Sequence, residues 1–225
     1  MVEVNESGAP QTDTSDMLAV HQVFRDALEG APDYIGTVEP GDALRSAVVG
    51  SYYYNVLRFL EVHHSGEDEL VTPLLVERCT PEEVELVRTI ASQHHAVEAP
   101  VESAHAVLGK WTADADAESG AELTSILGEL GEALVPHLDA EEAGVLPLAA
   151  DHLSGEEWGA LPGHGLQHFA GDNVWLILGL IRESLTEEHR QHMLTAMPPP
   201  VVEAWNSVGE GAYLGFMASL RQNRV

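Results

Sequence analysis

The chain has 225 residues, 44% of them hydrophobic, and carries 37 acidic against 10 basic residues, a formal net charge of −27. Such a length can bury one sizeable core with an extension, and the charge argues against nucleic acid or anionic membranes as partners. A single cysteine, Cys79, excludes an internal disulfide and favours a reducing compartment. Residues 1–16 lack the basic and apolar regions of a secretory signal, and no apolar run could span a bilayer. We therefore expect a soluble, cytoplasmic protein.

The first predicted helix follows an expected flexible N-terminal tail, residues 1–14. One of the residues 14–16 can cap this helix, and apolar residues then recur at steps of three and four through Leu18, Phe24 and Leu28. His21 falls on the same face. A histidine in the core stripe of a helix needs a polar partner.

The second predicted helix runs from about residue 42 to 76 and contains His63 and Glu67. Residues four apart on a helix lie one above the other, so an imidazole nitrogen and a carboxylate oxygen can converge there on one cation. This mixture of ligands favours a redox-capable first-row metal.

The third predicted helix begins at Thr80-Pro81-Glu82-Glu83, which combines a capping threonine, an N-terminal proline and acidic residues at the helix start. It continues to about Leu108 with His94 on its apolar stripe, while His95 points about 100° away. A loop over residues 111–120 leads to the fourth helix, residues 121–153, which carries His137 and Glu141 at the same spacing of four.

These residues form an internal repeat. His63, Glu67 and Pro73 match His137, Glu141 and Pro147 at an offset of 74 positions, and His21 and His94 lie 73 apart. A duplication of this kind predicts a pseudo-twofold four-helix arrangement in which the two His-x-x-x-Glu pairs face one another.

The chain resembles the hemerythrin-like (HHE) cation-binding domains over roughly residues 15–153. The resemblance rests on the order of a single histidine followed by His-x-x-x-Glu, twice, and therefore on His21, His63, Glu67, His94, His137 and Glu141. It implies an all-α, antiparallel four-helix bundle that holds a non-haem di-iron centre (Fe²⁺/Fe³⁺) with carboxylate and oxo or hydroxo bridges. The alternative is a set of core polar residues that satisfy one another, but burying these groups without a cation would be costly.

The function implied by the resemblance is binding of, or reaction with, O₂, NO or H₂O₂. Two hypotheses stay open: a protein that carries, stores or senses such a ligand or iron, and a di-iron oxidoreductase that removes peroxide or NO or oxidises a small organic substrate. The sequence does not decide between them.

Several further side chains are candidates for the centre. Glu98 stands one turn after His94, where the family pattern has a histidine, and is either a ligand that tilts the centre towards redox turnover or a solvated group. His168 lies 31 residues after His137, as His94 does after His63, and is either a further ligand or part of a helix lying against the bundle. A phenol of residues 52–54 could also coordinate. Because adjacent helical side chains diverge, we expect His64 and Glu142 outside the ligand set.

Residues 154–225 are expected to form a helical C-terminal extension packed on the bundle. Helices are predicted at residues 172–184 and 186–196, with a last amphipathic helix after Pro198-Pro199-Pro200. The aromatic side chains of this region could wall a substrate pocket, cap the bundle or form a homodimer interface; they are Phe169, Trp175, Trp205 and Tyr213.

Overall fold

The computed structural model describes residues 11–222, which are mostly helical and contain no strand. Residues 1–10 of the expected N-terminal tail lie outside the described residues. At the other end of that tail, the Thr12 backbone N–H donates to the Ala150 carbonyl at 2.9 Å, and the Gln11 amide donates to Asp151 at 2.7 Å. These two residues are thus bonded to the end of the last bundle helix.

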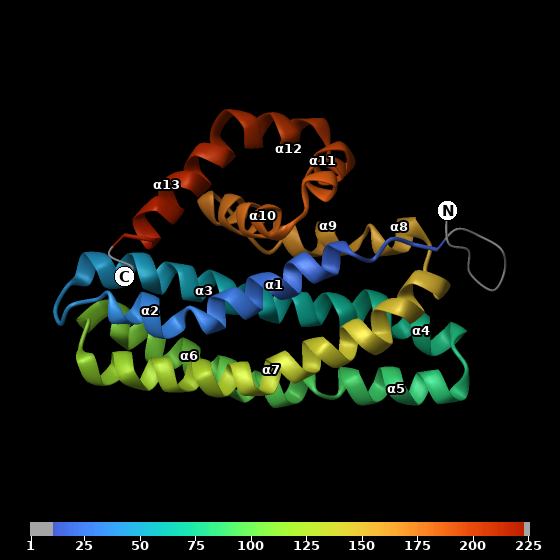
Figure 1. The fold of residues 1–225 in the computed structure, drawn as a ribbon, viewed down its shortest axis with the longest axis horizontal. Helices are drawn as coiled ribbons and strands as arrows, with labels where there is room; N and C mark the ends of the chain where they lie inside the picture. The colour runs from blue at the N-terminus through green and yellow to red at the C-terminus, as the bar shows by residue number, and fades with distance from the viewer. Residues whose placement is uncertain (1–10, 223–225) are drawn as a thin grey trace.

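The bundle has four long rods, each antiparallel to the one before it in the chain (Figure 1). The first and fourth rods are single helices, whereas the second and third are each built from consecutive segments. Each rod packs on two neighbours in the order first, second, third, fourth and back to the first. In chain order the segments are α1 (Asp16–Glu29), the short α2 (Ala31–Gly36), α3 (Ala43–Gly66), η1 (Glu67–Val71), α4 (Thr72–Arg78), α5 (Pro81–Ala91), α6 (His94–Asp114) and α7 (Ala117–His152).

Local sequence sets the starts of three bundle helices, α3, α5 and α7. The Asp42 side chain accepts from the Arg45 N–H at the start of α3, and Asp116 accepts from the Ser119 N–H at the start of α7. Thr80 and Glu83 form the reciprocal capping box expected from their spacing. The predicted start of the third rod is therefore confirmed.

Two rods differ from the uninterrupted helices that we expected. The second contains a π-helical segment, η1, that begins at Glu67. The third is broken at residues 92–93, so His94 is the first residue of α6. The expected loop at 111–120 is also shorter than predicted, because α6 continues to Asp114 and α7 begins at Ala117. The π-helical segment and the break at residues 92–93 lie beside the predicted ligands Glu67 and His94.

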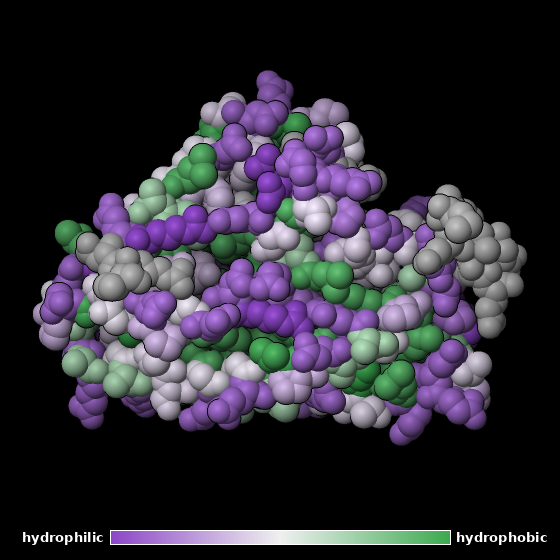
Figure 2. Space-filling view, in the orientation of Figure 1, coloured by the Kyte–Doolittle hydropathy of each residue, from purple (hydrophilic) through white to green (hydrophobic). Residues whose placement is uncertain are grey.

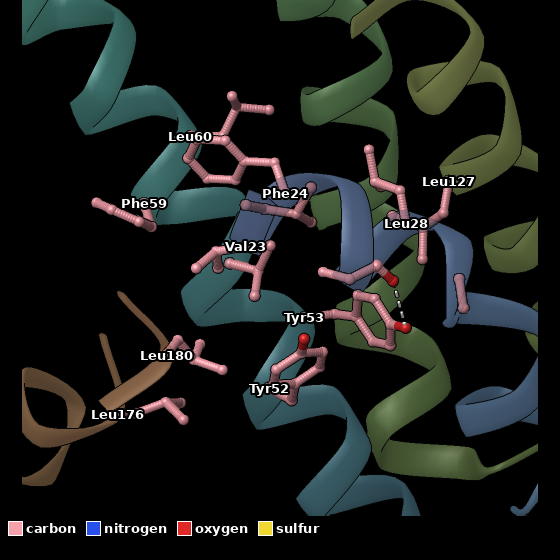
Figure 3. Packing of buried hydrophobic residues seen from close by; sticks show 14 of the residues in the cluster. Val23, Phe24, Leu28, Tyr52, Tyr53, Phe59, Leu60, Leu127, Leu176 and Leu180 are labelled. Atoms are coloured by element: carbon pink, nitrogen blue, oxygen red, sulfur yellow. Dashed lines mark hydrogen bonds between the residues drawn. The ribbon is translucent and has the colours of Figure 1, made fainter. Parts of the chain in front are cut away.

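The core of the bundle is aliphatic and aromatic (Figure 3). The Phe24 and Phe59 rings lie 5.1 Å apart, and buried leucines of α7 such as Leu127 close the opposite side. The Tyr53 hydroxyl donates to the Ala27 carbonyl at 3.0 Å (Figure 3). This bond satisfies a phenol that is completely buried.

The extension lies over the outer side of α1 and α3 (Figure 1). The predicted helix at 172–184 is confirmed, and the one expected at 186–196 begins one residue later. α9 packs on α3, α10 packs on α1 and α3, and α13 packs on α3 and α10. The segments are α8 (Gly155–Trp158), α9 (Leu161–Leu166), α10 (Asp172–Ser184), α11 (Glu187–Ala196), α12 (Pro199–Ala204), the π-helical η2 (Trp205–Gly209) and α13 (Glu210–Leu220).

A buried arginine joins the extension to the bundle. The Arg45 guanidinium, near the start of α3, donates to the carbonyls of Ser219 and Leu220 at 2.6 Å each. Carbonyls in the last turn of a helix have no partner within that helix, so a cation placed there satisfies them.

We expect Gly179→Ala to destabilise the extension. A Cβ at Gly179 would overlap the Tyr213 ring where α10 packs on α13, and a ring held in a packed core cannot move aside without strain. The expected loss is about 1–3 kcal/mol in the free energy of unfolding, measured by urea denaturation. Gly215→Ala is the matched control: its Cβ meets nothing within 4 Å, so a mid-helix alanine should be neutral or stabilising by up to about 1 kcal/mol. Equal stability of the two variants would contradict this packing.

The surface is predominantly hydrophilic, with apolar residues scattered between charged ones on the face shown in Figure 2. Within residues 11–222 no helix combines the length and the apolar character needed to cross a membrane.

Candidate metal centre

The two His-x-x-x-Glu pairs face each other inside the bundle. In the second rod the His63 Nε2 lies 3.3 Å from the Glu67 Oε1, and in α7 the His137 Nε2 lies 3.9 Å from the Glu141 Oε2. All four residues are buried. The helical spacing of four therefore places each imidazole against its own carboxylate, as expected from the sequence.

α1 contributes His21, which is completely buried. Its ring lies 5.2 Å from that of His63, and its Nε2 lies 3.5 Å from the Glu141 Oε2. His21, His63, Glu67 and Glu141 each offer a ligand atom within 4.8 Å of the others. They form the first candidate cation site, which we call the α1 site.

A second group of three buried histidines lies beside the first. His64, His94 and His137 offer nitrogens within the same 4.8 Å limit. The rings of His64 and His94 stack at 4.1 Å, and the His137 ring stands edge-on to both, at 5.3 Å and 4.9 Å. We call this group the α6 site.

Each carboxylate lies between the two sites. Glu67 directs Oε1 towards His63 of the α1 site, while its Oε2 lies 3.6 Å from the His94 Nε2 of the α6 site. The Glu141 Oε2 lies 3.5 Å from the His21 Nε2 and 3.9 Å from the His137 Nε2. A carboxylate in such a position can serve a cation on either side.

The outward nitrogens of three histidines have partners of their own. The Nδ1 atoms pair with Glu142 for His21 (2.8 Å), with Asp68 for His94 (3.1 Å) and with Gln93 for His137 (3.2 Å). Partners of this kind fix the tautomer and direct the other nitrogen, Nε2, at a metal. The break between α5 and α6 matters here, because Gln93 lies within it.

Arg25 secures one of these partners. Its guanidinium donates to Glu142 at 2.7 Å and to Asp139 at 2.7 Å. His21 and Arg25 together lower the pKa of Glu142 from its ordinary value, the hydrogen bond from His21 contributing most. Glu142 is therefore an ionised partner outside the candidate ligands, in agreement with the expectation for this residue.

Burial keeps several of the imidazoles neutral. Burial, together with the neighbouring histidines, lowers the pKa of His64 to about 2 and that of His137 to about 4. The pKa of His63 is well below its ordinary value for the same reasons. A neutral imidazole has a free lone pair, which is the form that binds a metal.

The pKa of Glu67 shifts in the opposite direction. Burial raises it well above its ordinary value, and the adjacent Glu141 charge raises it further. Ionising Glu67 this deep in the bundle and this close to Glu141 is unfavourable without a cation. The arrangement is therefore costly for the protein alone and suited to a metal that neutralises it.

The decisive observation concerns hydrogen bonding. Among the described residues, most buried side-chain nitrogen and oxygen atoms without a hydrogen-bond partner converge on this centre; they are the Nε2 atoms of His21, His63, His64 and His137, both oxygens of Glu67 and Oε2 of Glu141. Buried polar groups are normally satisfied, so such a cluster requires another partner. Five imidazoles and two carboxylates fit first-row metal cations.

Comparison with known proteins agrees with this geometry. The model of the hemerythrin HHE cation-binding domain matches residues 12–149. The chain belongs to the hemerythrin HHE family. The family and the helical-bundle fold are thereby confirmed, and the two candidate sites fit the cation binding for which the family is described. No curated protein and no solved structure matches the chain.

The hemerythrin bundle brings together the six residues singled out from the repeat, and His64 joins them. The further candidates lie elsewhere. Glu98 is exposed and pairs with His95 at 3.0 Å, and His168 is exposed with its ring 5.2 Å from that of His164. Neither belongs to the two candidate sites.

The three consecutive tyrosines contact residues that belong to neither site. Tyr53 donates to Ala27, Tyr52 packs at 5.5 Å from the Tyr34 ring, and Tyr54 is exposed beside His105. These contacts give no support to a phenol of residues 52–54 as a ligand.

His64 departs from the expectation that it lies outside the ligand set. His63 and His64 point in different directions, as adjacent helical residues must, but α3 has a bundle neighbour on each side. His63 faces α1 and His64 faces α6. The sequence feature that indicates this is the His63-His64 pair itself. Consecutive residues of a helix point about 100° apart, so in a four-helix bundle one can face one neighbouring helix while the next faces the other.

We expect His64→Leu to abolish cation binding at the α6 site while stabilising the metal-free protein. The α6 site would lose one of its three imidazoles, and a buried nitrogen without a partner would be replaced by an apolar group, a gain of about 1–3 kcal/mol. Stoichiometry by elemental analysis and urea denaturation of the metal-free form test both parts. His95→Ala, at an exposed neighbour of His94, is the control. Two ions bound with unchanged affinity in His64→Leu would place His64 outside the ligand set.

Proposed function

We propose that this hemerythrin-family protein holds two iron ions, one in the α1 site and one in the α6 site, and that it binds O₂, NO or peroxide there. The observation that carries the proposal is the position of Glu67 and Glu141, whose unpartnered oxygens face histidines of both sites. Iron bound there would supply the redox chemistry that such ligands require. The protein supplies a buried, preorganised set of neutral imidazoles and shared carboxylates.

The composition of the centre favours reversible binding. Five imidazoles accompany two carboxylates, and Glu98 lies on the surface. A carboxylate-rich centre, which would have favoured ferric iron and turnover, required Glu98 as a ligand. His64, and not Glu98, belongs to the centre, which is therefore rich in histidine. This composition favours reversible ligand binding over an oxidoreductase.

The surroundings of the centre favour a small ligand. The Phe24 ring lies 5.3 Å from that of His63, and Val97 and Leu138 are buried on the neighbouring helices. The aromatic residues of the extension pack elsewhere: Phe169 lies against Phe59, and Trp175 lies against Trp205. They cover the bundle, which supports a diatomic ligand or peroxide over an organic substrate.

The test is anaerobic loading of the metal-free protein with ferrous iron, followed by one addition of O₂ and optical absorption, and then by removal of O₂ under vacuum. A plateau at two irons and a charge-transfer band that disappears under vacuum would support the proposal. A band that decays and turns over with a reductant or peroxide would favour the oxidoreductase.

Two variants complete the experiment. The double replacement His63→Ala and His137→Ala removes one imidazole from each site and should abolish both stoichiometric iron binding and the band. Glu98→Gln should leave both unchanged, because Glu98 is exposed. Retention of two irons in the double variant would refute the assignment of the two sites.

A further inference from the structure

A third group of metal-ligating side chains lies at one end of the bundle. Cys79, Glu83 and His152 offer ligand atoms within 4.8 Å of one another, and all three residues are half-buried. Cys79 lies in the turn between α4 and α5, Glu83 in the first turn of α5, and His152 is the last residue of α7. The group therefore joins two rods of the bundle.

This group is separate from the hemerythrin centre. Cys79 follows Glu67 by 12 residues and His152 follows Glu141 by 11, and both rods run in the same direction. About three helical turns, or roughly 17 Å, separate it from the shared carboxylates. None of its residues contributes to the α1 or α6 site.

The internal repeat shows how the group arises. At the offset of 74, Arg78 corresponds to His152, and Glu83 corresponds to Glu157. Arg78 donates to Glu157 at 2.6 Å, which closes an ion pair between the two halves. At the related position the guanidinium is replaced by the imidazole of His152, which faces Glu83.

A second difference between the halves supplies the thiol. Cys79 corresponds to Leu153, which is buried in an apolar cluster. Glu157 is thus paired with a permanent cation, Arg78, and the position equivalent to Cys79 holds the aliphatic Leu153. The equivalent carboxylate, Glu83, lies with an imidazole from the second half, His152, and a thiol from the first, Cys79, both of which are metal ligands.

The carboxylate is already held in place. The Glu83 Oε2 accepts from the Thr80 N–H at 2.8 Å and from the Thr80 hydroxyl at 2.9 Å, as part of the capping box. Outer partners of this kind orient a ligand and reduce the entropy lost when a metal binds. The other oxygen, Oε1, is the one that we assign to a cation.

We propose that Cys79, Glu83 and His152 form a mononuclear site for a borderline-soft divalent cation of the zinc class, with a water molecule in the fourth position. Thiolate, imidazole and carboxylate oxygen are the ligands that zinc takes in proteins, and three protein ligands leave one position open. On binding, the Cys79 thiol releases its proton to solvent. The bound cation links the turn between α4 and α5 to the end of α7.

Titration of the full chain with Co²⁺ as a probe tests the proposal. The chain has one cysteine, and the hemerythrin centre has no sulfur, so a near-ultraviolet sulfur-to-cobalt charge-transfer band can come only from Cys79. We expect this band to saturate at one equivalent beyond any cobalt that the hemerythrin centre takes up, and to decrease when Zn²⁺ is added. The readout does not depend on whether the hemerythrin centre is filled, or on what it does.

Variants of Glu83 and His152 decide whether these residues hold the cation together with Cys79. Glu83→Gln keeps the capping box, because glutamine also serves at this position, but it removes the charged ligand. His152→Asn removes the imidazole. Each should raise the Kd for the cobalt that gives this band by at least about tenfold, since even loss of an outer partner has that effect. Glu82→Gln, which alters the adjacent carboxylate, should leave the Kd unchanged.

Two results would overturn the proposal. One is absence of the charge-transfer band in the wild-type chain at millimolar cobalt. The other is a band of equal affinity in Glu83→Gln, His152→Asn and wild type, which would mean that cobalt binds a lone thiol. Circular dichroism of each variant confirms that the helices are intact, so that a loss of the band reports on the ligands.

Discussion

Glu67→Gln is expected to weaken the binding of both iron ions at once. The two Glu67 oxygens lie 3.3 Å from the His63 Nε2 and 3.6 Å from the His94 Nε2, so a single side chain faces both sites. Glutamine has nearly the same volume, but it has no charge and one acceptor oxygen fewer. We expect both Kd values to rise by at least about a hundredfold, measured by anaerobic calorimetric titration with ferrous iron.

The neighbouring pair Glu141 and Glu142 provides the matched comparison for this prediction. Glu141 lies between the two sites, whereas Glu142 pairs with the Nδ1 of His21 from outside. Glu141→Gln should reproduce the loss of both ions, and Glu142→Gln should weaken mainly the α1 site, by about tenfold. Wild-type affinity for two ions in Glu67→Gln would show that this carboxylate is not shared.

The metal-free protein is expected to lose stability as the pH falls from 7 to 5. Burial lowers the folded-state pKa of His64 to about 2 and of His137 to about 4, whereas an unfolded chain titrates near 6.5. The unfolded state then binds more protons, so the stability present above pH 6.5 decreases on acidification, by about 2 kcal/mol for each histidine at pH 5. The lowered pKa of His63 acts in the same direction.

Glu67 opposes this trend but does not reverse it. Its pKa is raised in the folded state, so its contribution is full at low pH and is lost as the pH rises. Three histidines act against one carboxyl group, which leaves a net loss of a few kcal/mol at pH 5.

Urea denaturation at pH 7 and pH 5, with and without metal, measures this balance. Metal at a thousandfold excess over Kd should stabilise the protein at pH 7 by about 4 kcal/mol for each site, because only the folded state assembles the ligands. His64→Leu should retain more stability at pH 5 than the wild type. A metal-free midpoint that is equal at the two pH values would contradict the buried, neutral histidines.

The sequence predicted the bundle and most of its centre because both depend on spacing along helices. Residues four apart share a face, so the spacing alone is enough to pair His63 with Glu67 and His137 with Glu141. The repeat then indicated which single histidines accompany them. The same reasoning from spacing favoured His168 only weakly, and the structure places it on the surface.

What the sequence could not predict depends on packing between helices. Whether His64 faces solvent or α6 is decided by the arrangement of the rods around α3, which no local pattern records. The π-helical turn at Glu67 is a similar case. Pro73 follows it, and proline disturbs the preceding turn, but Pro147 occupies the equivalent position in α7 without such a widening. Proline alone therefore does not determine it.

The guanidinium of Arg45, bonded to Ser219 and Leu220, has a consequence for how the chain folds during synthesis. Ribosomes make the rods of the bundle well before α13, since 174 residues separate Arg45 from the first of its two carbonyl partners. Until the last helix is made, a nascent bundle therefore exposes the apolar outer side of α1 and α3. Over the same interval Arg45 lacks its two acceptors in α13.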